Sequence, residues 1–156
     1  MFVNHTGSVF CCGDNTKGQL GSDPLQTAGS ATPRHVKGIP AQVRIASVSC
    51  GKNHTLALST GGEVYCWGGN KYGQCGVGVK SEEPVLPHHL DYLLGAPVYA
   101  VAAGGNHSIA VTVSGTLISW GQNGFGQLFN YYLVISTEIG LFLVPPLRKM
   151  VPFWSI

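Results

Sequence analysis

The sequence predicts an all-β protein built from stacked antiparallel sheets, and three observations support this fold class. A glycine-rich motif occurs three times at a nearly constant spacing. The apolar runs near each copy are of strand length and are bounded by Gly, Asn, Ser or Pro. Charged residues make up only 10% of the chain and glycines number 22, a composition that suits strands and turns better than helices.

The repeated motif reads GSVFCCGDNTKGQLG at residues 7–21, GEVYCWGGNKYGQCG at 62–76 and GTLISWGQNGFGQLF at 115–129. Each copy contains the pattern G-x-N-x-x-G-Q, whose first glycine stands at 13, 68 and 121, so the copies lie 55 and 53 residues apart. A second element has the same period, because VSCGKNHTLAL at 48–58 matches VAAGGNHSIAV at 101–111. Two elements that share one period predict a repeat architecture.

Six short apolar runs are predicted to be strands, because they are rich in Val, Ile, Ala and aromatic residues. In chain order they are 43–50, 55–59, 63–67, 98–103, 108–113 and 116–120. In the fifth run, bulky residues at 109, 111 and 113 alternate with small residues at 108, 110 and 112. One face of this strand is therefore expected to pack closely against a neighbouring sheet.

The G-x-N-x-x-G-Q segments are predicted to be tight turns, since Gly and Asn tolerate left-handed backbone conformations. Two longer connections, 22–42 and 77–97, carry several prolines, and Pro33 and Pro87 hold nearly equivalent repeat positions. Because proline lacks a backbone donor, an outer, irregular strand or loop is expected in each connection. Several strands in each unit and no helical period predict stacked sheets of the propeller kind.

The motifs at 7–21, 48–76 and 101–128 resemble the regulator-of-chromosome-condensation repeat, whose members form seven-bladed propellers of four-stranded blades. The resemblance covers about residues 1–128. Among the branches of this family, the sequence is most similar to the propeller regions of HERC ubiquitin ligases. This resemblance implies a parent protein in which the propeller precedes a distant catalytic HECT domain.

The repeat divides the chain into five segments: 1–6 as the end of a truncated preceding strand, 7–59 as repeat 1, 62–112 as repeat 2, 115–128 as a partial repeat 3, and 129–156 as a non-repeat apolar tail. The expected architecture is a partial β-propeller of about two to three blades of a seven-bladed type. We expect a truncated fragment of marginal stability, whose tail derives from alternative splicing or a truncated gene model. The most apolar window of the tail, 133–144, is too short for a membrane span of about 20 residues.

The residues that recur with the repeat are interpreted as structural. His54 and His107 are expected to satisfy polar groups between strands or blades, and Trp67 and Trp120 to pack between blades. The glycine clusters could be mistaken for phosphate loops, but such loops open a helix, and here turn residues follow. The predicted structural signature consists of Gly13, Gly18, Gln19, Gly51, His54, Trp67, Gly68, Gly73, Gln74, Gly104, His107, Trp120, Gly121, Gly126 and Gln127.

Three Asn-x-Ser/Thr sequons, at Asn4, Asn53 and Asn106, could be glycosylation acceptors. The sequence begins without the basic and apolar regions of a secretory signal, so a structural role is expected for these sites, with the protein in the cytoplasm or nucleus.

The five cysteines form an odd set without a C-x-x-C pair, and they are expected to be reduced and mostly buried. A zinc site made by Cys50 and His54 with Cys66 or Cys75 is the alternative, but these spacings match no familiar ligand motif. No catalytic residue, cofactor-binding residue or metal ligand is assigned, and no cofactor is expected.

The nine basic residues are scattered and the net charge is +2, so no nucleic-acid or membrane partner is expected. The leading hypothesis is a non-catalytic interaction scaffold, the propeller portion of a HERC-type ubiquitin ligase, which binds protein partners through blade-end loops such as 22–42 and 77–97. The founding family implies an alternative, guanine-nucleotide exchange on a small Ran-like GTPase. A third hypothesis is a truncated product without independent function.

Overall fold

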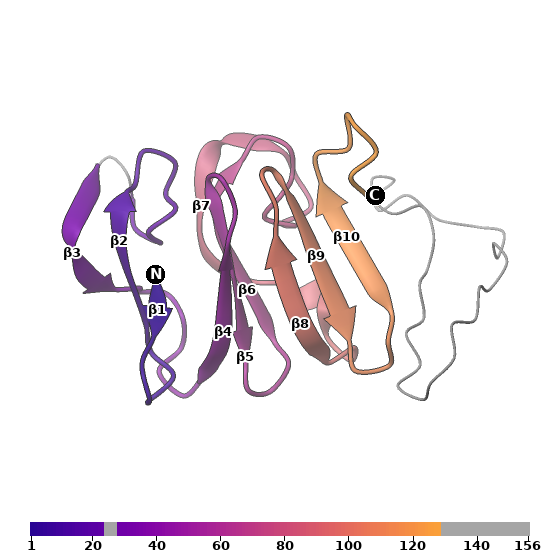
Figure 1. Cartoon of the computed structure of the whole chain (residues 1–156), viewed down its shortest axis with the longest axis horizontal. Helices are drawn as coiled ribbons and strands as arrows, with labels where there is room; N and C mark the ends of the chain where they lie inside the picture. Colours follow the sequence, from indigo (N-terminus) through magenta and orange to yellow (C-terminus); the bar gives the residue numbers. More distant parts are fainter. Residues whose placement is uncertain (24–27, 129–156) are drawn as a thin grey trace, which may run out of the picture.

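The chain folds into three antiparallel sheets that stand side by side in a computed structural model, which describes residues 1–23 and 28–128 (Figure 1). We call these sheets the first, second and third blades. The all-β class predicted from the repeat is confirmed, since one short 3₁₀ turn, η1 (Asp91–Leu93), is the only helical element among the described residues. The expected tail at 129–156 lies outside the described residues.

The strands of each blade pair antiparallel with their sequence neighbours. The first blade has the order β1 (Phe2–Val3), β2 (Val9–Asp14) and β3 (Gly29–His35). The second blade has the order β4 (Ile45–Cys50), β5 (His54–Ser59), β6 (Val64–Asn70) and β7 (Ser81–His89). The third blade contains β8 (Val98–Ala103), β9 (His107–Thr112) and β10 (Leu117–Gly121).

The sequence repeat is out of phase with the blades. Residues 7–59 contain β2 and β3 of the first blade and then β4 and β5 of the second, and residues 62–112 likewise contain β6 to β9. In the described residues the first blade has no counterpart of β4, and the third blade has no counterpart of β7. Each repeat therefore ties two neighbouring blades together through the chain itself.

The two long connections, 22–42 and 77–97, each contain an edge strand. The hypothesis that partners bind through these segments treated them as loops, but much of each segment is strand. β3 lies within 22–42 and β7 lies within 77–97, each at the outer edge of its sheet. Prolines fit there because an edge strand leaves every second backbone N–H without a partner strand. The pairing of β6 with β7 is irregular, with register shifts on either side of Gly68.

Each junction between blades has its own hydrophobic core. The first junction, between the first and second blades, is built around Val9, Tyr65 and Trp67, and the second junction around Leu56, Val64 and Trp120. The strands β5 and β6 are buried along their whole length, because the second blade is covered on both faces. In β9 the small residues are buried against the second blade and the bulky ones are half-buried on the opposite face.

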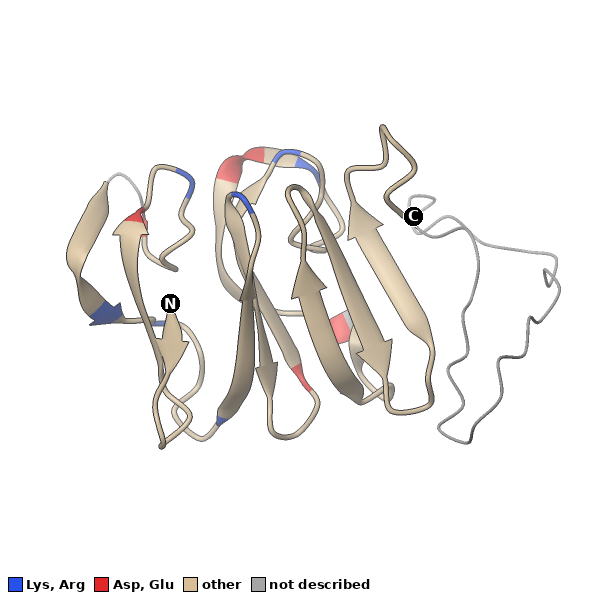
Figure 2. Ribbon diagram, viewed as in Figure 1, with Lys and Arg blue, Asp and Glu red and all other residues tan. Residues whose placement is uncertain are grey.

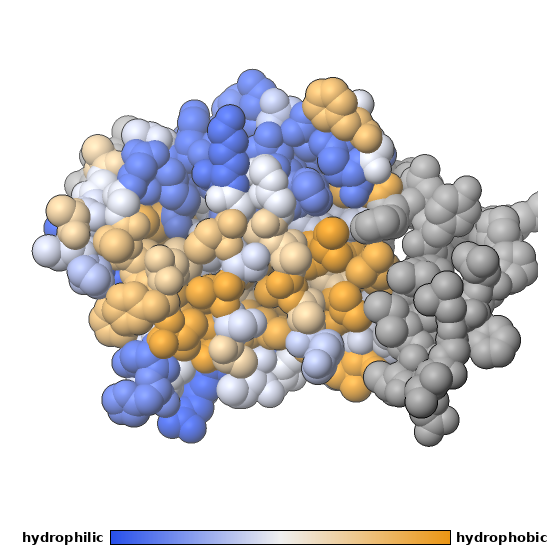
Figure 3. Space-filling model, in the orientation of Figure 1, coloured by the Kyte–Doolittle hydropathy of each residue, from blue (hydrophilic) through white to orange (hydrophobic). Residues whose placement is uncertain are grey.

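The two ends of the blades differ in polarity from their middle. Figure 3 shows hydrophilic residues gathered at the top of the molecule, over the turns, and a hydrophobic band across the middle of the visible face. Basic segments of three turns lie at this top end (Figure 2). The polar top is where the G-x-N-x-x-G-Q turns project, and it is the region where side chains are free to meet a ligand.

Candidate functional site

Each G-x-N-x-x-G-Q turn at the top is closed by its own asparagine and glutamine. The asparagine Oδ1 accepts the backbone N–H five residues later, as in Asn70 to Cys75 at 3.0 Å, and the same bond forms in the other two copies at 2.9 and 3.0 Å. The glutamine Oε1 accepts the N–H two residues earlier, as in Gln74 to Tyr72 at 2.9 Å. The glycine between them has a φ of +79° at Gly73, a left-handed conformation that a side chain would strain.

The backbone carbonyl of the same glutamine holds the next blade. The carbonyl of Gln74 accepts hydrogen bonds from Ser108 Oγ at 2.8 Å and from Trp120 Nε1 at 2.9 Å. At the first junction, the carbonyl of Gln19 accepts Trp67 Nε1 at 3.0 Å and a longer contact of 3.4 Å from a threonine hydroxyl. We call this arrangement the junction latch. It fixes the position of one turn relative to the neighbouring blade, and it gives Trp67 and Trp120 the same role at the two junctions.

His54 lies inside the second junction. Its Nε2 is 2.9 Å from Ser108 Oγ, and since the single hydroxyl proton of Ser108 goes to Gln74, the imidazole must donate through Nε2–H. Its Nδ1 is buried and has no hydrogen-bond partner in the described part of the chain. Burial, followed by the nearby His107, lowers the pKa of His54 to about 4, so this residue is neutral near pH 7.

The glycines around this histidine make room for it. A Cβ at Gly51 would overlap the His54 imidazole, and Gly104 stands in the same relation to His107. Gly68 has a φ of +103°, and a Cβ there would meet the carbonyl of Asn53. The predicted glycine signature thus marks close approaches within a blade as well as turns.

The three sequon asparagines lie in turns or beside them. Asn4 Oδ1 accepts the N–H of Thr6 at 3.0 Å and that of Ser8 at 2.9 Å. Asn106 donates through Nδ2 to Gln122 Oε1 at 2.9 Å. The side chain of Asn53, in contrast, makes no hydrogen bond to a described residue and lines a surface hollow.

The five cysteines do not gather at one place, although Cys66 and Cys75 are neighbours in the second junction. Cys11, Cys66 and Cys75 are buried, Cys12 and Cys50 are exposed, and all five are free thiols. Burial is the main cause that raises the pKa of the Cys66 thiol well above its usual range. Within residues 1–23 and 28–128, no group of three or more His, Cys, Asp or Glu side chains is placed to hold a metal ion.

The turns of the three blades surround a hollow of about 170 Å³ at the top. Lys17 of the first blade, Lys52, Lys71 and Gln74 of the second, and Asn106 of the third all line it. A wider hollow of about 380 Å³ adjoins it and shares Lys17 and Glu82, together with Asp23 and Glu83. We call the smaller cavity the lysine hollow. Sequence reasoning missed it, because its lysines come from turns that are distant in the chain.

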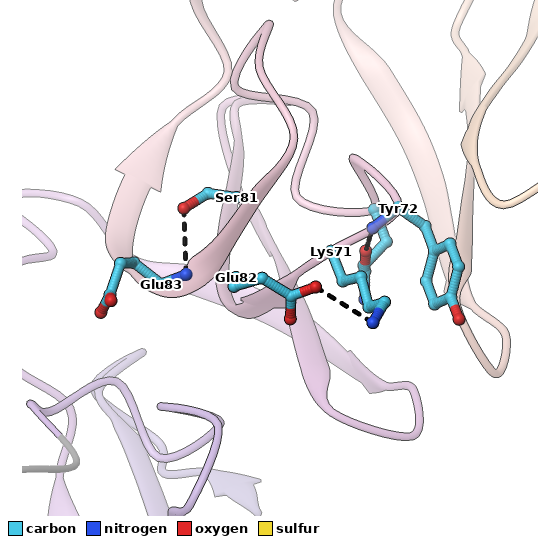
Figure 4. A network of polar contacts seen from close by, with 6 residues as sticks. Lys71, Tyr72, Ser81, Glu82 and Glu83 are labelled. Atoms are coloured by element: carbon cyan, nitrogen blue, oxygen red, sulfur yellow. Dashed lines mark hydrogen bonds and ion pairs between the residues drawn. The ribbon is translucent and has the colours of Figure 1, made fainter.

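The lysine hollow carries one ion pair on its rim. Lys71 Nζ lies 3.0 Å from a carboxylate oxygen of Glu82, and both side chains are largely exposed. Figure 4 shows the Lys71 side chain directed toward Glu82, while the ring of Tyr72 points away from the pair. Such an exposed pair contributes little to stability, so these side chains are free to rearrange around a ligand. In the described residues Lys17 and Lys52 make no ion pair.

Stacked antiparallel blades joined by latches, with an edge strand outermost and a repeat that spans two blades, define the β-propeller class of repeat proteins. The family model of the regulator of chromosome condensation (RCC1) repeat matches residues 6–58 and 61–111, and a second model of the same repeat matches 45–74 and 98–127. The chain therefore belongs to the RCC1 repeat family.

Known proteins place this chain near one branch of the family. It is 49% identical to the probable E3 ubiquitin-protein ligase HERC4 of Homo sapiens over 62% of this chain and 9% of that protein. It is 40% identical to the probable E3 ubiquitin-protein ligase HERC6 of Homo sapiens over 82% of this chain and 12% of that protein. The chain thus spans about a tenth of the length of these relatives.

A solved structure shows the same fold. Prp20p of Saccharomyces cerevisiae, described together with its binding properties to Gsp1p and histones, superposes with a TM-score of 0.63 at 30% identity. The similarity covers 78% of this chain and 28% of that one. No helix in the described part of the chain is long and apolar enough to cross a membrane.

Proposed function

We propose that this chain is a non-catalytic protein-interaction scaffold and forms the propeller portion of a HERC-type ubiquitin ligase. The similarity to HERC4 and HERC6 supports the ligase branch, and the ubiquitin-transfer domain of such a ligase would lie outside the 156 residues. One observation carries the scaffold role. The recurring asparagines, glutamines and tryptophans are engaged in turns and latches, whereas the two turn positions after each asparagine, which differ between blades, are exposed or half-buried at the top.

The reading frame of the full-length transcript tests the ligase assignment. We expect a HECT-coding region in the same frame as residues 1–128, reached by a transcript that skips the segment coding for 129–156. A complete transcript without such a region would contradict the assignment.

A ubiquitin-loading assay tests the non-catalytic role. We expect no thioester on the chain when it is incubated with ubiquitin, an activating enzyme and a conjugating enzyme, because Cys11, Cys66 and Cys75 are sealed in the blade junctions. A reducible ubiquitin adduct on Cys12 or Cys50 would contradict this role.

Guanine-nucleotide exchange is the second candidate, favoured by the fold shared with Prp20p, whose binding to Gsp1p is described. Release of a fluorescent guanine nucleotide from a Ran-like GTPase distinguishes the two candidates. The scaffold proposal predicts no acceleration by the chain, and a catalytic acceleration would favour exchange.

A further inference from the structure

The three copies of the turn differ at the residue before the asparagine, which is Asp14, Gly69 and Gln122 in chain order. In the first blade the Asp14 carboxylate accepts hydrogen bonds from Thr16 Oγ1 at 2.8 Å and from Gln19 Nε2 at 2.7 Å. The bonds from Thr16, and then the one from Gln19, lower the pKa of Asp14. The first turn is therefore a site that binds its own carboxylate.

The second turn keeps the glutamine of this site but lacks the carboxylate. Gln74 is only 2% exposed, and its Oε1 is engaged by the backbone of Tyr72. Its Nε2 makes no hydrogen bond to any residue that the structure describes, although the equivalent Nε2 of Gln19 is bonded. Gly69, which stands where Asp14 does, lines the lysine hollow beside Gln74. A nearly buried glutamine with an unbonded amide donor thus lines a cavity at the place where the first blade holds a carboxylate.

The charges around this donor favour an anion. Lys17, Lys52 and Lys71 line the lysine hollow, against the single carboxylate of Glu82, which is paired with Lys71. A Cβ at Gly69 would lie 3.6 Å from the Cβ of Lys17 and 3.3 Å from that of Asn53. A carboxylate at the Asp14-equivalent position would therefore sit between an unpaired lysine and a second free amide. The acidic residues Asp23 and Glu83 lie on the adjoining wider hollow instead.

We infer that the lysine hollow binds the carboxylate of an aspartate or glutamate side chain from an acidic segment of a protein partner. The ligand completes in the second turn the arrangement that Asp14 completes in the first. The inference rests on the proposed interaction function and names the chemistry of the partner. A single pocket lined by three lysines fits a carboxylate better than the backbone of a nucleic acid, for which the chain offers no basic stripe.

The test is an NMR titration of the uniformly ¹⁵N-labelled 156-residue chain with a capped peptide, acetyl-Ser-Glu-Asp-Glu-Ser-amide. The matched control peptide is acetyl-Ser-Gln-Asn-Gln-Ser-amide. We expect a saturable shift of the Gln74 side-chain amide with the acidic peptide alone. Raising the salt concentration from 0.05 to 0.5 M should weaken binding by about fivefold or more, because the charges lie near the surface. Equal shifts with both peptides would overturn the inference.

Gly69→Asp supplies the missing carboxylate from within the chain and should weaken peptide binding at least about tenfold. Gly69 does not have a positive φ, so a side chain needs only a small shift of Asn53. Gly69→Ala is the matched control, since it adds the same Cβ without the charge, and it should bind the acidic peptide within about twofold of wild type. Binding by Gly69→Asp at wild-type strength would exclude this site.

Lysine substitutions keep the test independent of any folding defect at Gly69. Lys52→Gln should weaken binding about fivefold, whereas Lys37→Gln, an equal charge change at an exposed residue outside the hollow, should leave it unchanged. Displacement of the peptide by equimolar inorganic phosphate would identify a phosphate site and overturn the carboxylate assignment. If the peptide fails to bind while the transcript encodes a HECT region, the carboxylate inference falls and the proposed ligase scaffold stands.

Discussion

His54 and His107 occupy the same position of the repeat, but their surroundings differ. His54 is 1% exposed and bonded to Ser108 across the second junction, and its neighbour Leu56 is fully buried. His107 is half-buried, its ring makes no hydrogen bond to a described residue, and the equivalent neighbour Ile109 is also half-buried. Within residues 1–23 and 28–128, a following blade covers His54 but not His107. The residues of this motif therefore stabilise the fold where a neighbouring blade covers them.

Substitutions of the equivalent residues Leu56 and Ile109 should give the largest difference in stability between the two histidine sites. Leu56→Ala should lower the free energy of unfolding by about 3 to 4 kcal/mol, because it opens a cavity in a closed core. Ile109→Ala removes a similar side chain from the half-buried face and should cost about 1 kcal/mol. Urea denaturation of the 156-residue chain measures both values. Equal losses would show that the two faces are equivalent.

Acid should lower the free energy of unfolding through protonation of His54, which lies in the second junction. The folded pKa of about 4 lies below the ordinary value of 6.5, so the unfolded chain takes up the proton first. The stability from neutral His54 is therefore fully present above pH 6.5 and is lost as the pH falls toward 4, by at most about 3 kcal/mol. Melting temperatures measured across this range should fall in the wild type.

The matched variants of this pH experiment are His54→Gln and His107→Gln. His54→Gln should remove most of the fall in melting temperature between pH 6.5 and 4. His107→Gln should leave most of that fall in place. A slope that survives in His54→Gln would assign the acid sensitivity to another group.

Gly13 and Gly68 hold equivalent positions of the repeat but are expected to tolerate a side chain to different degrees. Gly68 and Gly13 have similar φ values of +103° and +112°, so alanine strains both. A Cβ at Gly68 would also meet the carbonyl of Asn53, whereas nothing lies within 4 Å of one at Gly13. Gly68→Ala should therefore cost about 2 kcal/mol more than Gly13→Ala in the free energy of unfolding. Equal unfolding midpoints would contradict the close approach.

The latch hydroxyls give the smallest expected difference. Ser108→Ala removes a 2.8 Å bond to Gln74 and leaves the Nε2–H of His54 unpaired, which should cost about 1.5 kcal/mol. Thr55→Val removes only the 3.4 Å contact to Gln19 and should cost about 0.5 kcal/mol. Denaturation curves of the two variants measure the loss in the free energy of unfolding. A larger loss for Thr55→Val than for Ser108→Ala would contradict this prediction.

The turns were predictable from sequence because their chemistry is local. Asn70 bonds a residue five positions away, and Gly73 supplies the left-handed backbone that the pattern predicts. The phase of the blades was not predictable in this way, since the sequence repeat begins in the middle of a sheet. Phe129 stands where Gly21 and Gly76 have φ values of +73° and +69°, and it lies outside the described residues.

The lysine hollow could not be predicted from any single motif. Lys17, Lys52 and Gln74 meet only after the first two blades have stacked. Asn53 was interpreted as a structural position because the sequence begins without a secretory signal. One signal was present in the aligned copies. Asp14 aligns with Gly69 in the repeat, and the glutamine that binds the Asp14 carboxylate is retained as Gln74. This combination indicates that the second turn lacks a carboxylate that the first turn has.

The junction latch also bears on the order in which the chain folds. Its hydrogen bonds join residues that are 34 to 48 positions apart, whereas the β5–β6 hairpin joins partners across a short turn. Closing the longer loops costs more chain entropy before any contact rewards it. The hairpins are therefore expected to form early and the latches to close near the end of folding, so the blades are assembled as units and locked together last.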